Sequence, residues 1–521
     1  VLSDRTVHKC TRLREAKCGT TVCQFCAVGC SQLAFYKDKE LIEVEGDPRS
    51  PINAGRQCPK GMSTFMLNRN PYRETRALYR APGASEWEEK SIDWMLDTIA
   101  DRIWETRNKG FVEKDENGLT INAATNIGFI GGSALDNEEC YLIRKLFTGG
   151  LGILPTETSA RYCHSTTVAA LSPTFGFGAC TNPPRDLINS DCILIMGSNM
   201  GEAHPVAFHW PMEAKRKGAI TIHVDPRFTR TSARSSMYAP LRSGTDIAFL
   251  GGMIKYILDH DLYFKDYVLS YTNAAFLVNP KFSFNDGLFS GYDAQKHAYD
   301  KSSWSFQKDG KGLIKRDDTL KNPHCVFQLM KKHYDRYDLK KVSSITGTPE
   351  ADLLAVYKAF AATGKPDKAG TIMYALGQCH HSVAVQNIRT MTIVQLLLGN
   401  IGICGGGINA LRGEPNVQGS TDHALLSHYL PGYLKAPKAS WQTLEQYIAG
   451  TTPQTANPQS LNWMSNTGKY ATCLMRAFYP EGGTPENGFG YDYLPKLDDG
   501  QDASVMSMID AMYAGKIKGL T

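Results

Sequence analysis

Short apolar runs that end in glycine or polar turns alternate with amphipathic segments along most of the chain. The candidate strands are residues 126–132, 192–196, 220–224 and 371–376, whose length suits buried strands. The candidate helices are residues 92–106, 137–147 and 207–217. Strand, turn and helix in succession predict an α/β fold, with parallel sheets covered by helices on both faces.

In such folds, ligands bind just beyond the carboxyl ends of the parallel strands. The turns after the candidate strands are therefore candidate cofactor loops: Gly131-Gly132, Gly197-Ser198-Asn199, Asp225-Pro226-Arg227 and Gly377. For any single turn, a simple reversal of the chain is an equally good interpretation. No GxGxxG fingerprint follows these strands and the chain has no Walker A loop, which argues against binding NAD or ATP in the standard manner.

Three regions depart from this alternation. Residues 33–36 and 41–44 are β-prone runs joined by a polar turn, which predicts a small N-terminal β module. Residues 275–325 show little periodicity and predict a surface insertion. Residues 430–500 are rich in Pro, Gly and Asn and predict an irregular tail with short helices.

Composition narrows the class of protein. The chain has 521 residues, of which 42% are hydrophobic and 21% charged, enough for a large soluble core divided among domains. Its formal net charge of +5 is small for this length, and no nucleic-acid motif accompanies it. The sequence contains no run of about 18 apolar residues, so it predicts no transmembrane helix. The 14 cysteines are mostly scattered, unlike a dense disulfide framework.

Four cysteines near the N-terminus carry the first chemical prediction. Cys23, Cys26 and Cys30 have C-x2-C-x3-C spacing, and Cys58 follows in a Cys-Pro-Lys-Gly turn. Three thiolates from one loop and a fourth from a later turn can hold a 4Fe–4S cluster. Structural zinc and disulfides are the alternatives, although zinc more often takes two C-x2-C hairpins. A 4Fe–4S cluster would place the chain in a redox pathway.

A series of motifs then occurs in a fixed order. They are the cysteine loop with Cys-Pro-Lys-Gly, Ala160-Arg161-Tyr162-Cys163-His164, Glu202-Ala203-His204-Pro205, Asp225-Pro226-Arg227-Phe228-Thr229-Arg230, Arg242-Ser243-Gly244-Thr245-Asp246, Gln386-Asn387-Ile388-Arg389-Thr390, Leu411-Arg412-Gly413 and Asn416-Val417-Gln418-Gly419. In this order they resemble the catalytic (alpha) subunit of the molybdopterin oxidoreductases. Within that family they resemble the formate dehydrogenases, of the large exported, periplasmic or membrane-associated type. The similarity covers nearly the whole chain.

The resemblance implies how the domains are arranged. We expect an iron–sulfur cluster domain over residues 1–75 and a first, discontinuous α/β pterin-binding domain over 76–159 plus 413–521. A second Rossmann-like α/β pterin-binding domain is expected over 160–412, with the insertion 275–325.

The resemblance also implies two molybdopterin guanine dinucleotides that hold one molybdenum or tungsten atom. Cys163 matches the position of the family's cysteine or selenocysteine ligand to this metal, and a soft donor suits it. On spacing alone, a small buried residue would be the more usual interpretation of Cys163.

Three further residues match the family's catalytic positions. His164 is expected to accept or relay the proton that formate releases, because its ordinary pKa lies near neutrality. Arg412, in a glycine-flanked loop, is expected to bind the formate carboxylate with its guanidinium fork. Lys60 is expected between cluster and pterin, where it would stabilise negative charge on the electron path. A hydrogen-bonded structural histidine, an arginine bound to loop carbonyls and a solvated lysine are the alternatives.

The dinucleotides are expected to bind at the strand-end turns. The candidate cofactor-binding residues are Gly197, Ser198, Asn199, Glu202, Asp225, Arg227, Ser243, Asp246, Gly377 and His381. Among them, the carboxylate of Asp246 suits the donor edge of guanine. His380 stands where the family has a glutamine, so contacts of that side chain are in question.

The resemblance implies partners as well. Family subunits continue into a C-terminal β-barrel-like domain over the pterins, which this sequence lacks, so a separate chain is expected to supply it. A ferredoxin-like subunit with further iron–sulfur clusters is expected to take the electrons. The chain begins with Val1 rather than Met; removal of a leader on export to the periplasm, or a trimmed sequence, would give this beginning.

The activity that the resemblance implies is the reversible two-electron oxidation of formate to CO2. The electrons would leave through pterin to the 4Fe–4S cluster. The alternatives are a related reductase on the same scaffold, such as a nitrate reductase, and an electron-transfer subunit that has lost the metal.

Overall fold

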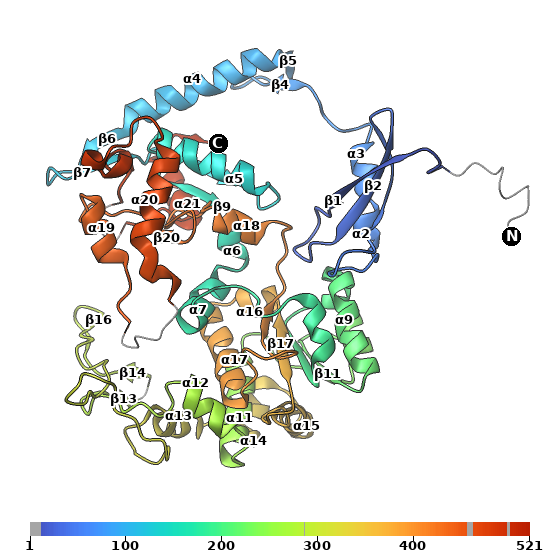
Figure 1. Ribbon diagram of the computed structural model, residues 1–521, viewed down its shortest axis with the longest axis vertical. Helices are drawn as coiled ribbons and strands as arrows, with labels where there is room; N and C mark the ends of the chain where they lie inside the picture. Colours follow the sequence, from blue (N-terminus) through green and yellow to red (C-terminus); the bar gives the residue numbers. More distant parts are fainter. Residues whose placement is uncertain (1–11, 286, 456–461, 498–500) are drawn as a thin grey trace, which may run out of the picture. The chain divides into compact units, whose positions relative to one another are not determined.

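The computed structural model describes residues 12–285, 287–455, 462–497 and 501–521. By its internal contacts the chain, drawn in Figure 1, divides into two compact units. Unit 1 consists of Val1–Glu45, Pro59–Cys163 and Gly413–Thr521, and unit 2 of Gly46–Cys58 and His164–Arg412. Each unit is therefore assembled from segments that lie far apart in the sequence. The predicted three-domain division is not tested by this partition and stays a prediction.

A five-stranded parallel sheet forms the centre of unit 2. The strand order is β12-β11-β10-β17-β18, and every neighbouring pair runs parallel. The strands are β10 (Cys192–Met196), β11 (Ile220–Val224), β12 (Met237–Ala239), β17 (Gly370–Tyr374) and β18 (Ile408–Ala410). Two of the predicted strands thus have the predicted bounds, and the third begins and ends slightly earlier than expected.

Helices pack on this sheet, as the alternation in the sequence predicts. Helix α9 contacts β11 and α17 contacts β17 (Figure 1), and α15 contacts β10 and β12. The helices of unit 2 are α7 (Ser165–Phe175), α8 (Met200–Ala203), α9 (Pro205–Arg216), α10 (Arg230–Arg234), α11 (Asp246–Asp259), α12 (Lys265–Tyr271), α13 (Val326–Tyr334), α14 (Leu339–Thr346), α15 (Glu350–Ala361), α16 (Leu376–Cys379) and α17 (Ala384–Leu398), with a 3₁₀ helix at Pro184–Asn189.

The central strand of unit 2 is buried on both faces. All five residues of β10 are buried, as are all five of β17, so neither face of these strands meets water. Burying each aliphatic side chain contributes about 1.5–3 kcal/mol. The same core takes in residues of α11, α15 and α17, among them Phe249, Phe360 and Met391. This rigid layer fixes the positions of the loops that leave the strand ends.

The predicted surface insertion is only partly external. Its middle forms small hairpins from β13 (Phe284–Asn285), β14 (Leu288–Phe289), β15 (Tyr292–Asp293) and β16 (Ala298–Tyr299), with residue 286 outside the described residues. Its two ends are anchored, because Ala275 and Cys325 are fully buried in the core of unit 2. Periodicity alone misses these anchor points.

Unit 1 contains a smaller parallel sheet. Its order is β21-β8-β9, from β8 (Ile127–Gly131), β9 (Thr156–Thr158) and β21 (Gly519–Leu520). Strand β8 follows α4 (Ile92–Gly110) and precedes α5 (Asn137–Arg144), as predicted, and α5 continues into a π-helical turn at Lys145–Gly150.

The predicted N-terminal β module is confirmed as a three-stranded sheet. Its order is β1-β2-β3, with β1 antiparallel to β2. Its strands are β1 (Lys17–Val22), β2 (Ser31–Lys37) and β3 (Glu40–Gly46), and the chain continues through α2 (Pro59–Met62), α3 (Thr64–Asn68), β4 (Ala77–Tyr79) and β5 (Glu88–Lys90) to α4, then β6 (Phe111–Lys114) and β7 (Thr120–Ala124). Together with the two parallel sheets, the module confirms the predicted fold class.

The expected irregular tail has a core of its own. Leu444, Tyr447, Met475 and Tyr491 pack together in unit 1. The elements here are α18 (Val417–Asp422), β19 (Tyr429–Leu430), β20 (Leu434–Lys435), α19 (Leu444–Thr451), α20 (Thr467–Phe478) and α21 (Val505–Tyr513), with 3₁₀ helices at Trp463–Asn466 and Pro485–Tyr493. Residues 456–461 and 498–500 lie outside the described residues.

Helix α4 carries apolar side chains at its surface. Ile92, Leu96 and Ile99 are 52%, 56% and 43% exposed, and they share one face because they are spaced four and three residues apart. Acidic residues such as Asp93 and Asp97 interrupt the apolar positions. Over the ranges that the structure describes, no helix is both long and apolar enough to cross a membrane.

Candidate functional site

The loops after β10 and β17 meet at the carboxyl end of the unit 2 sheet. From β10 the chain builds the sheet outward through β11 and β12, and it later adds β17 and β18 on the other side. The order therefore reverses between β10 and β17. In open parallel sheets, ligands bind at such a reversal, just beyond the strand ends.

Two glycines let these loops touch. Gly197 has a φ of +67°, and the N–H of Gly377 donates to the carbonyl of Gly197 at 3.1 Å. A Cβ atom on Gly377 would lie 2.6 Å from that oxygen, so a larger residue requires one of the two loops to shift. Both predicted glycines are thus brought together, and they leave backbone rather than side chains at the strand ends.

Ser198, Asn199 and Asp225 lie on the β10 and β11 side of this edge. His223 Nε2 donates to the Ser198 carbonyl at 3.1 Å, and burial lowers the pKa of His223. The Ser198 hydroxyl is buried without a hydrogen-bond partner among the described residues. Asn199 accepts from the Thr231 hydroxyl at 3.1 Å, and Asp225 accepts from the backbone N–H of Arg227 at 2.9 Å.

Three of the predicted cofactor-binding residues, Glu202, Arg227 and Ser243, have exposed side chains. Glu202 accepts a hydrogen bond from the Asn199 amide and forms an ion pair with Arg230 at 3.0 Å. Arg227 and Ser243 are exposed at the surface of unit 2. These side chains are open to solvent, unlike those of Ser198 and Asp246, which are buried.

Asp246 is the buried carboxylate of the edge and begins α11. Gln378 Nε2 donates to Asp246 Oδ1 at 2.7 Å, and His381 Nε2 lies 4.0 Å from Oδ2. His381 Nε2 also lies 2.8 Å from the Gly377 carbonyl, so it joins the carboxylate to the β17 loop. Burial raises the pKa of Asp246, against the lowering effect of the Gln378 hydrogen bond. Within the described chain, Oδ2 accepts no hydrogen bond.

His164 is fully buried in unit 2. Its Nε2 lies 3.1 Å from the Leu411 carbonyl, and its Nδ1 lies 3.1 Å from the Thr167 hydroxyl. Burial and the nearby charge of Arg412 lower the pKa of His164 to about 3. The ring is therefore neutral near pH 7, and its predicted proton role has to operate from this neutral, hydrogen-bonded state.

Arg412 is a buried cation. It is 5% exposed; its Nη2 donates to the Gly178 carbonyl, and its own carbonyl lies 2.7 Å from His204 Nε2. Its Nε–H has no acceptor among the described residues, and none of their carboxylates forms an ion pair with it. A buried guanidinium without an anion is costly unless one binds.

Cys163 and Lys60 belong to unit 1. Cys163 ends α6 (Ala160–Cys163), and its N–H donates to the Ser159 carbonyl at 3.1 Å. A Cβ atom on Gly413 would lie 4.0 Å from the Cys163 sulfur. Lys60 is exposed in α2. The metal and electron-path roles of these two residues stay predictions.

Three of the four N-terminal cysteines share one hairpin loop. The pair Val22 and Ser31 closes it, and the N–H of Cys23 donates to the Cys30 carbonyl at 2.9 Å. Cys23 and Cys30 are buried and Cys26 is half-buried, whereas Cys58 belongs to unit 2. In the described part of the chain, no three His, Cys, Asp or Glu side chains are arranged to hold a metal ion, so the four-cysteine ligand set stays a prediction.

The structure adds residues that the sequence did not single out. Gln378, His204 and Thr167 contact predicted site residues through hydrogen bonds, and Tyr374 donates to Thr167. Each lies within or beside a motif or predicted strand, which was the available signal. Their pairings depend on the strand order of unit 2, which the sequence does not state. His380, in the motif that departs from the family, is exposed.

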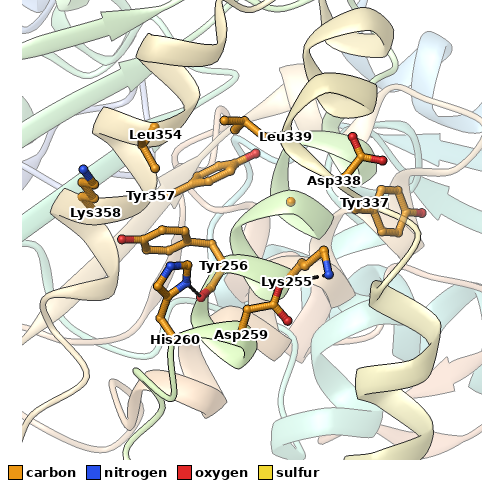
Figure 2. Close-up of a pocket in the computed structure, with 11 residues that line it drawn as sticks. Lys255, Tyr256, Asp259, His260, Tyr337, Asp338, Leu339, Leu354, Tyr357 and Lys358 are labelled. Atoms are coloured by element: carbon orange, nitrogen blue, oxygen red, sulfur yellow. Dashed lines mark hydrogen bonds and ion pairs between the residues drawn. The ribbon is translucent and has the colours of Figure 1, made fainter.

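A separate pocket of about 390 Å³ lies in unit 2 (Figure 2). Tyr256, Tyr337 and Tyr357 contribute to its lining, together with side chains of α11, α14 and α15. Lys255, on its wall, is already paired with Asp259 at 2.9 Å and Asp335 at 2.7 Å. No residue predicted from the sequence to bind cofactor or substrate lines this pocket.

The sheet and its strand-end edge define a cofactor-binding α/β protein, and comparison with known proteins identifies its family. The family model described as molybdopterin oxidoreductase matches residues 114–520, and that of the molybdopterin oxidoreductase Fe4S4 domain matches residues 16–68. The chain therefore belongs to the molybdopterin oxidoreductase family. Its two matched regions are those of a metal–pterin cofactor and a 4Fe–4S cluster, as the motifs predict.

Similar curated proteins are formate dehydrogenase subunits. The formate dehydrogenase subunit alpha of Megalodesulfovibrio gigas is 55% identical over 97% of this chain and 50% of its own length. The nitrate-inducible formate dehydrogenase major subunit of Escherichia coli is 44% identical over 98% of this chain and 51% of its own. The chain thus spans about half the length of the curated relatives it matches.

A solved structure supports the fold. Acetylene hydratase from Pelobacter acetylenicus matches with a TM-score of 0.51 and 19% identity, over 75% of this chain and 44% of that one. At this identity the likeness concerns the fold alone.

Proposed function

We propose that this chain forms the catalytic part of a formate dehydrogenase. The reaction is HCOO⁻ → CO2 + H⁺ + two electrons, and it is reversible. The observation that carries the proposal is Arg412: a buried guanidinium with a free Nε–H and no carboxylate paired to it among the described residues. The formate dehydrogenase subunits at 55% and 44% identity support the same activity.

Arg412 would bind the formate carboxylate. Guanidinium and carboxylate form two parallel, charge-assisted hydrogen bonds when both donors are available. Arg412 offers Nε–H and a second N–H on Nη2, whose other hydrogen bonds the Gly178 carbonyl. Binding an anion here would also relieve the cost of a buried, uncompensated cation. The neutral ring of His164 would receive or relay the proton.

The cofactor we propose is a pair of molybdopterin guanine dinucleotides holding molybdenum or tungsten, with Cys163, as cysteine or selenocysteine, on the metal. When bound, this centre accepts the two electrons of formate. The unit 2 edge would hold one dinucleotide: backbone at Gly197 and Gly377 would face its phosphates, and Asp246 its guanine. The free Ser198 hydroxyl and Asp246 Oδ2 fit a polar ligand with its own donors.

The polar side chains around these glycines would complete the dinucleotide site. The residues in this set are Asn199, Glu202, Asp225, Arg227, Ser243 and His381. Electrons would pass to a 4Fe–4S cluster on Cys23, Cys26, Cys30 and Cys58, with Lys60 near their path.

We propose two protein partners. The first is the other half of the family's length, including its C-terminal pterin-binding domain. Exposed apolar side chains in unit 1, on α4 at Leu96 and Ile99 and on α21 at Met506 and Ile509, support it, because such surfaces are usually covered. The second is an iron–sulfur electron-transfer subunit. We place the complex in the periplasm.

The proposal is tested on the purified complex of this chain with its partners. Molybdenum and tungsten are measured by mass spectrometry, and viologen reduction is followed with formate as donor. The proposal expects metal and formate-dependent reduction. A complex without either metal would show an electron-transfer subunit instead, and a metal-loaded complex that turns over nitrate but not formate would show a nitrate reductase.

A further inference from the structure

Two histidines hold the backbone on either side of the substrate arginine. His164 Nε2 lies 3.1 Å from the carbonyl of Leu411, and His204 Nε2 lies 2.7 Å from the carbonyl of Arg412. Both rings are buried in unit 2, at 0% and 4% exposure. A carbonyl only accepts, so each ring carries its proton on Nε2 in these bonds.

The proton on His164 Nε2 fixes the direction of a longer chain of hydrogen bonds. In the tautomer that has its proton on Nε2, Nδ1 is an acceptor, and the Thr167 hydroxyl donates to it at 3.1 Å. The Tyr374 hydroxyl in turn donates to Thr167 Oγ1 at 3.0 Å. The chain thus runs in one direction, from Tyr374 through Thr167 and His164 to Leu411.

Tyr374 also holds Leu411 directly. It is the last residue of β17, and its backbone carbonyl accepts from the Leu411 N–H at 2.8 Å. The Leu411 N–H is therefore bonded to the backbone of Tyr374, and the Leu411 carbonyl is bonded to His164, the end of the side-chain hydrogen-bond chain. Thr167 and Tyr374 are fully buried, so water does not compete for these bonds.

We propose that Thr167, Tyr374 and His204 are positioning residues that hold Arg412 in place for the substrate carboxylate. This inference rests on the proposed function. With the carbonyls of Leu411 and Arg412 both fixed, the backbone that carries the Arg412 side chain has one position. The guanidinium and its Nε–H are then presented to the substrate from that fixed position. A bidentate anion contact depends on such alignment, and a small displacement of a binding group is costly to the rate. Cys379, whose sulfur lies 3.4 Å from His164 Nδ1 and from Thr167 Oγ1, packs against the same chain.

The decisive variants remove one hydroxyl each. Thr167→Val keeps the side-chain volume and removes the hydroxyl that bonds His164, Tyr374 and the Cys379 sulfur, whereas Tyr374→Phe breaks only the bond from Tyr374 to Thr167. Loss of one hydrogen bond typically changes an equilibrium constant, here that of substrate binding, by a factor of about 2–10. In the holoenzyme complex, we expect the KM for formate to rise about tenfold in Thr167→Val and about threefold in Tyr374→Phe, with kcat changed less. Metal and iron contents stay at wild-type values.

Three controls separate positioning from general damage. Thr167→Ser restores the hydroxyl and is expected to restore the wild-type KM. Thr346→Val removes an equally buried hydroxyl, bonded at 2.9 Å to the Val342 carbonyl, and is expected to leave the KM unchanged. Calorimetric binding of nitrate, a planar anion of similar size that donates no hydride, is expected to weaken in parallel with the formate KM.

The outcomes are distinct. If the wild-type complex oxidises formate while Tyr374→Phe and Thr167→Val keep both the KM and the nitrate affinity within twofold, the positioning role is wrong. A KM that rises equally in Thr346→Val would also overturn it. If Thr167→Val does not accumulate, Tyr374→Phe and His204→Gln decide by the same criteria. A metal-loaded wild-type complex without formate oxidation would overturn the proposed function, and this inference with it.

Discussion

The two parallel sheets of this protein differ in how far their own units bury them. In unit 2, five strands lie between packed helices, and β10 and β17 are buried throughout. In unit 1, the sheet has three strands, and the helix α4 exposes Ile92, Leu96 and Ile99 at 52%, 56% and 43%. One sheet carries its own covering layers, whereas the other unit leaves apolar surface in contact with water.

The difference separates two sources of order in the molecule. Burial of the unit 2 sheet holds its strand-end loops, so Asp246 and Arg412 keep fixed positions although one polar atom of each, Oδ2 and Nε, has no hydrogen-bond partner among the described residues. Full burial of an aliphatic side chain contributes about 1.5–3 kcal/mol, and the aliphatic side chains of α4, which are about half exposed, forgo part of this until a protein surface covers them. Unit 2 thus presents a preformed polar edge, and unit 1 presents an apolar face that fits a protein partner.

The largest expected effect concerns the cysteine loop of unit 1. Cys23→Ser should remove a cluster ligand, so the iron content falls from about four per chain to near zero and formate-dependent viologen reduction is lost. Iron analysis and electron paramagnetic resonance measure this. Cys18→Ser, at an exposed cysteine outside the predicted ligand set, is the matched control. Undiminished iron in Cys23→Ser would contradict the predicted ligand set.

The next effect tests the apolar face of α4. Changing Leu96 and Ile99 to Asp together should weaken binding of the other half of the family's chain by about 100-fold or more, because two buried aliphatic contacts are replaced by desolvated charges. The dissociation constant, measured by calorimetry, reports this. Leu313→Asp alters an exposed leucine of unit 2, at 53% exposure, and should have little effect. If the double variant and Leu313→Asp lost affinity equally, the α4 face would not be the interface.

A smaller effect tests the close contact at the unit 2 edge. Gly377→Ala places a Cβ 2.6 Å from the Gly197 carbonyl, and such overpacking typically costs about 1–3 kcal/mol. We expect the thermal unfolding midpoint to fall by several degrees. Gly310→Ala, in unit 2 with open space around its Cβ position, should leave the midpoint nearly unchanged. If both variants melt like the wild type, the two loops do not need this contact.

The smallest effect is the pH dependence of Asp246. Burial raises its folded-state pKa, with Asp225 acting in the same direction and Gln378 and His381 opposing it. The folded protein then binds this proton more tightly than the unfolded chain, so stability falls as pH rises from the ordinary carboxyl value, near 4, through the raised pKa.

The variant Asp246→Asn removes the loss of stability that comes from ionising this buried carboxyl group. Without cofactor, it should unfold at a slightly higher temperature than the wild type at pH 7, and the difference should vanish near pH 4. Its affinity for a guanine nucleotide should fall by about tenfold or more, since a charged hydrogen bond is lost. A variant less stable than the wild type at pH 7 would show that the fold itself stabilises this carboxylate.

The sequence predicts the strands and helices of the sheet layers better than it predicts which distant residues contact each other. The apolar run at 192–196 is a strand because little else buries five consecutive apolar residues, and the C-x2-C-x3-C spacing predicts one cysteine loop. The contact from Gln378 to Asp246 joins residues 132 apart in sequence, and that from His204 to the Arg412 carbonyl joins residues 208 apart. Such pairs depend on which strands are neighbours, which local patterns do not encode.

Burial of charge is likewise invisible to local patterns. Arg412 was predicted to bind formate from its motif, but the absence of a carboxylate paired to it in the described residues is a property of the folded unit. The anchored ends of the insertion, Ala275 and Cys325, are a similar case, because their burial depends on packing in the core of unit 2 and not on a periodic pattern in the sequence.

Arg412→Lys in the holoenzyme complex tests the central claim most directly. Lysine keeps the charge but lacks the planar fork, so kcat/KM for formate should fall about 100-fold or more while molybdenum or tungsten and iron stay at wild-type content. Unchanged formate kinetics in a variant with full metal content would contradict the assignment of Arg412 as the formate-binding residue.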